Sequence, residues 1–173
     1  MSVAGSPCTT PASGRVGAGA CRIARSAEER ERHFAVRRAV FVDEQALFDV
    51  DDRDGRDDDP QTMHAVGAVV GVIGGTVRLY QLDDAGLWKG DRLAVLPVLR
   101  HGLLGAALVR FAVRTAGGLG GTRMTAMIQR PNVRFFEALG WRLDGAVAPY
   151  HGVDHQPMDI PLALPPRVSR ADR

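Results

Sequence analysis

Residues 91–110, DRLAVLPVLRHGLLGAALVR, constrain the fold of this chain more than any other segment. A short apolar strand meets a break at Pro97, and an arginine and glycine turn then leads into an amphipathic helix. A strand that enters a helix through such a turn presents unpaired backbone N–H groups at the positive end of the helix dipole. This corner favours a phosphate or pyrophosphate, although an ordinary strand–turn–helix corner has the same pattern.

Composition restricts the class of protein. The chain has 173 residues and a formal net charge of +2, the size of one domain with a substantial core. Arginines alternate with glutamates over residues 28–38, which is typical of a solvated helix face and not of a nucleic-acid-binding stripe. The longest uncharged apolar run, residues 62–77, is too short and glycine-broken for a membrane span. We therefore expect a cytoplasmic protein without nucleic-acid or membrane partners.

We expect three regions: a disordered leader over residues 1–19, one domain over 20–163 and a flexible tail over 164–173. The leader is rich in small residues and proline and lacks the charged and apolar regions of a signal peptide. Cys8 and Cys21 have neither metal-ligand spacing nor a catalytic neighbourhood, so both are expected to be inert thiols.

Hydrophobic periodicity predicts a mixed α/β sheet with helices on both faces. Ser26 and Glu29 have the spacing of a capping box, which predicts a helix running to about Val42. A turn at Val70 and Gly71 should join two strands as a hairpin. The expected strands are 21–24, 63–69, 72–82, 88–96, 122–128, 141–147 and 153–162, and the later helices are 103–116, ended by Gly117 and Gly118, and 131–140, ended by Gly140.

Residues 43–61 form a strongly acidic segment. It does not fit a calcium loop, because placing Gly55 at the invariant glycine puts Val50 and Gln61 at the first and last ligand positions. No metal site is predicted. A solvated loop is the default interpretation, and the alternative is a negative rim that attracts a cationic amine.

Four segments, in the right order, resemble the GCN5-related N-acetyltransferase (GNAT) family. Val95-x-Pro97-x-x-Arg100 with Gly105 resembles its acyl-CoA-binding segment, Arg/Gln-x-x-Gly-x-Gly/Ala. Residues 132–141, NVRFFEALGW, resemble its last helix, and residues 37–45, RRAVFVDEQ, and 150–158, YHGVDHQPM, resemble one subgroup. Residues 86–95, GLWKGDRLAV, further resemble a bacterial branch encoded beside nitrilase and radical-SAM genes.

The resemblance implies a GNAT-like mixed, mainly antiparallel central sheet that binds acetyl-CoA as co-substrate, with no metal. The strand over Leu93, Ala94 and Val95 would splay from residues 125–127, and the gap would receive the pantetheine arm. Leu103 stands where the family has its first glycine, which predicts a phosphate turn that is looser or binds differently, because leucine resists a positive φ. The pyrophosphate would lie on the backbone of Arg100, His101, Gly102, Leu103, Leu104, Gly105 and Ala106.

The resemblance also assigns the chemistry. The family's usual acid is a tyrosine that protonates the departing CoA thiolate, and the corresponding residue is Phe136, which implies another acid, a water, or weak chemistry. Phe136 is interpreted first as core, with packing against the CoA sulfur as an alternative. Tyr150 is the nearest tyrosine in sequence. Asn132 either caps its helix or contacts CoA. Candidate bases for the acceptor amine, each with a purely structural alternative, are Glu44, His64 and His155.

The expected reaction is acetyl transfer from acetyl-CoA to the amine of a small molecule by direct attack, since no cysteine or Ser/His pair is placed for a covalent intermediate. The alternative function is a catalytically weak CoA-binding module that acts as a sensor or partner of another enzyme. Leu103 and Phe136 favour this alternative. A homodimer is compatible with the resemblance, because dimers are frequent in the family.

Overall fold

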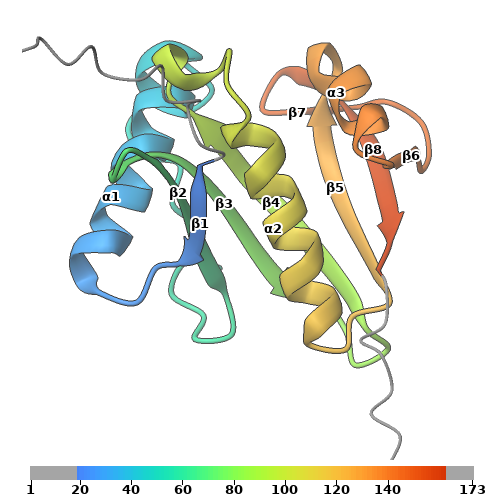
Figure 1. Ribbon diagram of the computed structural model, residues 1–173. Coiled ribbons are helices and arrows are strands. Elements are labelled where there is room, and N and C mark those ends of the chain that lie inside the picture. Colours follow the sequence, from blue (N-terminus) through green and yellow to red (C-terminus); the bar gives the residue numbers. More distant parts are fainter. Residues whose placement is uncertain (1–18, 163–173) are drawn as a thin grey trace, which may run out of the picture.

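The computed structural model describes residues 19–162 (Figure 1). The expected tail, nearly all of the expected leader, and Cys8 lie outside the described residues. The elements in chain order are β1 (Ala20–Ile23), α1 (Ala27–Arg38), the π-helical segment η1 (Ala39–Glu44), β2 (Met63–Val69), β3 (Val72–Gln81), β4 (Leu87–Val95), η2 (Pro97–Leu99), α2 (Leu104–Gly118), β5 (Arg123–Gln129), η3 (Arg130–Asn132), α3 (Val133–Ala138), β6 (Arg142–Leu143), β7 (Ala148–Tyr150) and β8 (Val153–Pro161).

One sheet organises the described chain. Its strand order is β1-β2-β3-β4-β5-β8-β6, with β7 also paired to β8. Every pairing is antiparallel except that of β4 with β5. Helix α1 lies on one face of the sheet, and α2 and α3 lie on the other (Figure 1). The mixed, mainly antiparallel sheet with helices on both faces is therefore confirmed.

Strands β4 and β5 separate partway along their length. They pair only from Leu87 with Arg123 to Lys89 with Thr125, although β4 continues to Val95 and β5 to Gln129. Figure 1 shows the two strands diverging toward the end of the sheet where α2 begins. The unpaired stretches leave backbone N–H and C=O groups free at an internal edge of the sheet.

Three local predictions are confirmed. The Ser26 hydroxyl accepts a hydrogen bond from the Glu29 backbone N–H at 3.1 Å, which fixes the start of α1. Val70 and Gly71 have φ of 50° and 80°, the left-handed geometry that a two-residue hairpin turn needs. Gly140 has a φ of 91° directly after α3, so it ends that helix.

Element boundaries differ from the predictions in three places. The first helix continues through η1 to Glu44, two residues beyond the expected end. Gly117 and Gly118 belong to α2, and the chain leaves the helix through Gly120, whose φ is 89°. The strand expected over 141–147 is reduced to β6, because Gly145, with a φ of 117°, interrupts the extended backbone, and β7 begins only at Ala148, beyond the expected strand.

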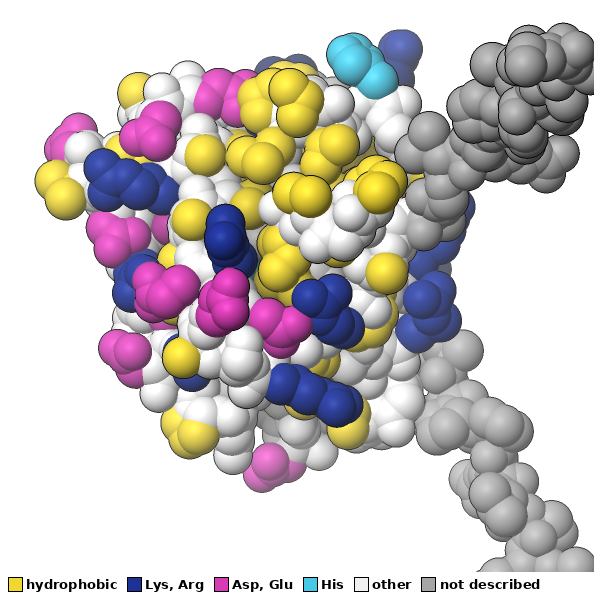
Figure 2. All heavy atoms as spheres, turned by 60° about the vertical axis from the view of Figure 1, so that its left-hand side comes forward, with side chains coloured by type: hydrophobic (Ala, Val, Ile, Leu, Met, Phe, Trp, Pro, Cys, Tyr) yellow, Lys and Arg dark blue, Asp and Glu magenta, His cyan; other side chains and the backbone are white. Residues whose placement is uncertain are grey.

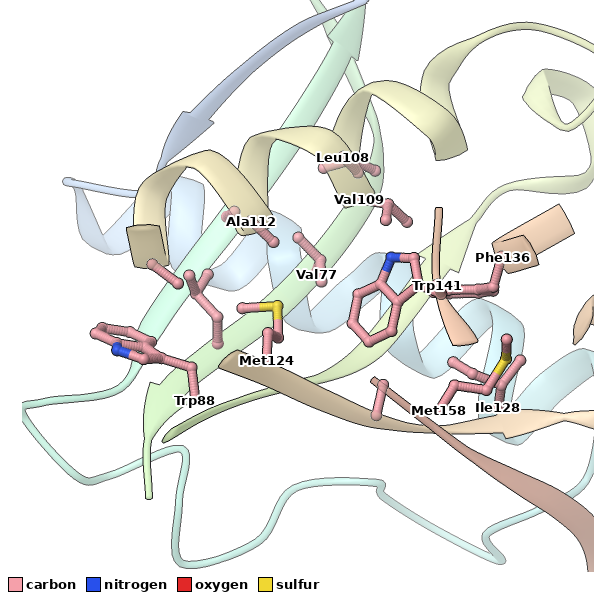
Figure 3. Packing of buried hydrophobic residues seen from close by; sticks show 14 of the residues in the cluster. Val77, Trp88, Leu108, Val109, Ala112, Met124, Ile128, Phe136, Trp141 and Met158 are labelled. Carbon is pink, nitrogen blue, oxygen red and sulfur yellow. The ribbon is translucent and has the colours of Figure 1, made fainter. Parts of the chain in front are cut away.

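The core divides by sheet face. The larger cluster packs α2 and α3 against the sheet and includes Leu108, Met124, Trp141 and Met158 (Figure 3). A smaller cluster on the α1 face contains Val36, Val40, Phe41 and Ala94. None of the helices between residues 19 and 162 is long and apolar enough to span a membrane.

Candidate active site

The separation of β4 from β5 opens into a pocket of about 180 Å³. Its walls include residues of both core clusters, Phe41 from the α1 face and Val77, Val109 and Met124 from the α2 face, so the pocket passes through the plane of the sheet. The wall residues outside those clusters include Gln45, Leu47, Phe48, Lys89, Gly90, Asp91, Arg92, Leu93, Met127, Gln129, Asn132, Tyr150, His151 and His155.

The turn before α2 has the features of a phosphate site. The first helical residues, Leu104, Gly105 and Ala106, have no intrahelical acceptors for their N–H groups, and no acidic residue lies in this first turn. Arg100 and Gly102 contribute less than expected, because their backbone N–H groups already donate to the carbonyls of Pro97 and Leu99. The Leu104 side chain is buried in the core, so only its backbone is offered to a ligand.

Leu103 does not disturb this turn. Its φ is −87°, an ordinary value for leucine, and neither Gly102 nor Gly105 has a positive φ. The reason for expecting a looser turn therefore does not apply, because no residue of this turn needs the left-handed conformation that glycine permits. The Leu103 side chain is largely exposed.

Arg100 and Glu44 form an ion pair at the rim. The Arg100 guanidinium donates two hydrogen bonds to the Glu44 carboxylate, at 2.6 and 2.5 Å, and a third to the Val95 carbonyl at 2.9 Å. The hydrogen bond from Arg100 holds the pKa of Glu44 below its usual range. In this arrangement Glu44 is a weak base and Arg100 is not free for a phosphate. The ion pair therefore weakens both residues in the roles considered for them.

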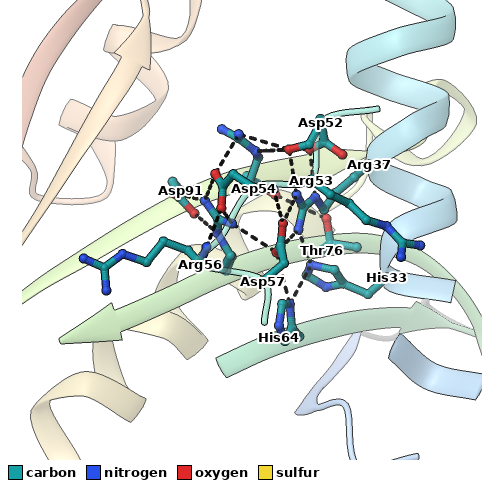
Figure 4. A network of polar contacts seen from close by, with 12 residues as sticks. His33, Arg37, Asp52, Arg53, Asp54, Arg56, Asp57, His64, Thr76 and Asp91 are labelled. Carbon is teal, nitrogen blue, oxygen red and sulfur yellow. Dashed lines mark hydrogen bonds and ion pairs between the residues drawn. The ribbon is translucent and has the colours of Figure 1, made fainter. Parts of the chain in front are cut away.

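The acidic segment is not simply a solvated loop. Asp52 and Asp57 are 1% and 3% exposed and pair with the buried Arg37 at 2.8 and 2.6 Å. Asp57 also pairs with the buried Arg78. Figure 4 shows Asp52 and Asp57 beside Arg37 in this network. Burial opposes ionisation of Asp57, but the hydrogen bonds from Arg37 outweigh it and hold its pKa below the usual range. The segment is thus fastened to α1 and β3, because buried carboxylates need charged partners.

The charges around this segment largely compensate one another. Arg92 pairs with Asp52 at 3.1 Å and with Asp54 at 3.2 Å, and Arg78 pairs with Asp91 at 2.7 Å. Acidic and basic side chains lie intermixed on the face that Figure 2 turns forward. These pairings weaken the alternative of a negative rim, since such a rim needs uncompensated carboxylates.

His64 belongs to the buried network and does not line the pocket. Its Nδ1 lies 3.4 Å from Nε2 of His33 and 3.8 Å from the Asp57 carboxylate. Burial lowers the pKa of His64, and it lowers that of His33 to about 3. Both rings are neutral near pH 7. The structural interpretation of His64 is therefore the one that the geometry favours.

His155 lies in the pocket wall, and its ring is buried. Its Nδ1 donates to the carbonyl of Val153 at 2.8 Å. This hydrogen bond places the ring proton on Nδ1 and leaves the lone pair on Nε2. Of the three candidate bases, His155 is the one that combines a position in the pocket with a nitrogen free to accept a proton.

Phe136 belongs to the core, as first interpreted, and it also lines the pocket. The ring is 6% exposed and packs edge-on against Trp141 (Figure 3). The indole N–H of Trp141 is buried, borders the same pocket and has no acceptor in the described part of the chain. A ligand oxygen would satisfy this donor.

Asn132 stands at the position before α3, but its side chain makes no capping hydrogen bond. The expected cap is therefore wrong, and Asn132 lines the pocket instead. The Ala94 side chain packs in the smaller core cluster on the α1 face, so only its backbone could flank a ligand.

Several pocket residues escaped the sequence analysis. Arg92 has a φ of 51° where the β3–β4 register shifts, and its guanidinium donates to the Tyr150 hydroxyl at 3.4 Å. Gln129 donates to the side chain of Gln45 at 3.0 Å, which links β5 to the end of η1. Gln45 is the last residue of the segment 37–45 that resembles the family, and this position could have marked it as a site residue. No sequence feature marked Arg92 or Gln129.

The remaining expectations concern the reactivity of the Cys21 thiol and metal binding. Burial raises the pKa of the half-buried Cys21 thiol, which makes it less reactive at neutral pH. Among residues 19–162, no group of three or more His, Cys, Asp or Glu side chains is arranged to hold a metal ion.

Comparison with known proteins identifies the class. The family model described as the acetyltransferase (GNAT) family matches residues 23–141, so the chain belongs to this family of acyltransferase enzymes. No protein of curated function matches the chain.

Solved structures share the fold at low identity. A Lactobacillus plantarum protein provisionally assigned as an N-acetyltransferase has a TM-score of 0.76 and 24% identity, over 85% of this chain and 100% of the other. Escherichia coli ElaA has a TM-score of 0.72 and 21% identity, over 82% of this chain and 98% of ElaA. An aminoglycoside 6'-N-acetyltransferase complexed with coenzyme A has a TM-score of 0.67 and 12% identity, over 85% of this chain and 99% of the other.

Proposed function

We propose that this protein transfers an acyl group from acyl-CoA to the amine of a small molecule by direct attack, with His155 as the general base. The observation that carries the proposal is the position of His155: it lines a pocket that opens where β4 and β5 separate, and its Nδ1 donates to the Val153 carbonyl, so Nε2 is the ring nitrogen available to accept a proton. The free N–H groups at the start of α2 would bind the CoA pyrophosphate, and the unpaired edges of β4 and β5 would flank its pantetheine arm.

The proposed step balances without a metal or a covalent intermediate. The neutral amine nitrogen attacks the thioester carbonyl carbon, and the C–S bond breaks as the C–N bond forms. Nε2 of His155 takes the proton that the amine loses. CoA leaves as the thiolate, which is a competent leaving group because a thiol ionises near pH 8.5.

Proton return to the thiolate has two candidate routes in this pocket. Phe136 has no proton to give, so the acid is either solvent or the hydroxyl of Tyr150. The Tyr150 ring lies 5.4 Å from that of His155, and its hydroxyl accepts a hydrogen bond from Arg92. Tyr150 is therefore the side chain that we assign as the acid when solvent is excluded.

The test is His155→Asn. The asparagine amide nitrogen takes the place of Nδ1 and retains the donor to Val153, while Nε2 is lost. Turnover, followed as thiol release with a panel of amines, should fall by about 10²-fold or more, and acyl-CoA affinity should stay the same. His151→Asn, in the same pocket wall, is the matched control. Full turnover in His155→Asn would remove His155 from the mechanism.

The weak CoA-binding module remains the second candidate function, and Phe136 at the acid position favours it. The same assay separates the two functions. CoA binding by calorimetry with no thiol release for any amine of the panel would establish the binding module.

Three narrower assignments belong to this proposal and rest on the sequence. Acetyl-CoA is the proposed minimal donor. The branch encoded beside nitrilase and radical-SAM genes rests on residues 86–95. We also propose a cytoplasmic location, on the basis of composition.

A further inference from the structure

The pocket extends beyond the place where a thioester carbonyl would meet the separated strands. The last paired residues are Lys89 and Thr125, yet the walls continue to Met124, inside the paired part of the sheet. They also reach Ala112, which lies in the interior of α2. We call this inner end, bounded by Val77, Gly90, Val109, Ala112, Met124 and Trp141, the inner chamber.

Small residues create this space. Ala112 is 2% exposed and presents only a methyl group from α2 toward the sheet. At Gly90 an added Cβ would already lie 3.4 Å from the sulfur of Met124. Figure 3 shows Val77 and Met124 lying beneath Ala112, with the Trp141 ring beside them. A larger side chain at either small position would occupy the chamber.

The chamber is suited to hydrocarbon. Apart from the indole N–H of Trp141, its bounding side chains are apolar. The nearby charged residues Lys89 and Asp91 alternate with Gly90 along β4, so their side chains lie on the opposite face of the sheet from the chamber, where Asp91 pairs with Arg78. An apolar cavity of about 150 Å³ accepts benzene, and the whole pocket here measures about 180 Å³. Acetyl alone would leave the chamber empty, which close-packed interiors disfavour.

We propose that the inner chamber is an acyl-chain site and that the donor is a medium-chain acyl-CoA of about four to six carbons. This proposal rests on the proposed function, because it takes the thioester to lie between β4 and β5. Each buried methylene favours binding by about fourfold. Hexanoyl-CoA adds four methylenes to acetyl-CoA, so even partial burial should tighten binding by more than about tenfold.

The experiment compares the affinities of CoA, acetyl-CoA and hexanoyl-CoA by calorimetry. The wild type should bind hexanoyl-CoA at least about tenfold more tightly than acetyl-CoA. Ala112→Leu should abolish this preference and leave the affinity for CoA and acetyl-CoA within about twofold. Ala138→Leu, at an exposed position of α3 outside the pocket, is the matched control and should retain the preference.

A second, smaller substitution tests the same site in case Ala112→Leu does not fold. Gly90→Ala adds one methyl group at 3.4 Å from Met124, and Gly90 has no positive φ, so the backbone accepts alanine. It should reduce the hexanoyl preference by about fourfold. Equal binding of both esters by the wild type, or equal losses for both in the two variants, would overturn the acyl-chain site alone. Failure of CoA and of both esters to bind would overturn the proposed function together with it.

Discussion

Arg100 and Glu44 connect the phosphate turn to the end of the first helix through two hydrogen bonds of 2.6 and 2.5 Å. The pair spans both sides of the site, because Arg100 precedes α2 and Glu44 ends η1. Both side chains are more than a third exposed, so the pair is worth less than about 1 kcal/mol. Under the proposed function, Glu44 would therefore compete with the CoA phosphates for Arg100.

Glu44→Gln should tighten CoA binding by about two- to fivefold, because the neutral amide holds Arg100 less strongly and removes a negative charge near the phosphate turn. Glu137→Gln, an exposed carboxylate of α3, is the charge-matched control. Calorimetry at low salt measures the difference. Weaker CoA binding in Glu44→Gln would show that the pair organises the turn rather than competing for it.

Leu103→Gly should leave CoA affinity unchanged or slightly weaker. The turn already has ordinary backbone angles, so glycine relieves no strain and costs up to about 1 kcal/mol of stability. Chemical unfolding and calorimetry test this. Tighter CoA binding would mean that the leucine side chain obstructs the ligand.

Gly105→Glu should abolish CoA binding. An added Cβ there meets only ordinary contacts, 3.6 Å to Phe135 and 3.8 Å to Val95, so the fold should survive. The carboxylate would then stand at the positive end of α2 and repel the phosphates. Gly105→Gln has similar size without charge and should lose less affinity. Equal losses in the two variants would indicate a steric effect.

Phe136→Tyr should retain the fold and keep or modestly raise turnover, because the ring lines the pocket and the hydroxyl adds a proton donor to that of Tyr150. Phe135→Tyr adds the same group to the partly exposed neighbour and serves as the control. Melting temperature and thiol release are both measured. A stability loss of about 1–3 kcal/mol without faster release would mean that the new hydroxyl is buried without a partner.

Acid should destabilise the fold through His33 and His64. Their pKa values are lowered on folding, to about 3 for His33, so below about pH 6.5 the unfolded chain binds protons that the folded chain does not. Stability should fall from about pH 6.5 toward 3, by up to about 1.4 kcal/mol per pH unit for each histidine. Urea unfolding at several pH values measures the slope.

His33→Asn should reduce that slope, because asparagine retains the donor to the Ala65 carbonyl and does not titrate. The exposed His101→Asn should keep the wild-type slope. An unchanged slope in His33→Asn would assign the acid sensitivity to other groups.

Local chemistry along the chain was sufficient for most of the elements, for their order in sequence and for the strand–turn–helix corner before α2. The Ser26 cap, the Val70-Gly71 turn and the Gly140 stop depend on a few neighbouring residues, so each was predictable. The matched segments also pointed correctly to the family. These features need no knowledge of distant contacts.

Only the tertiary structure decided what each candidate side chain can do. Glu44 and Arg100 are 56 residues apart and neutralise each other, and Asp57 is buried because Arg37 and Arg78 converge on it from α1 and β3. Equally, His155 and His64 look alike in sequence, but one lines the pocket and the other lies in the buried network. Charge state and basicity depend on burial and on partners brought together by the sheet, and these are set by long-range packing.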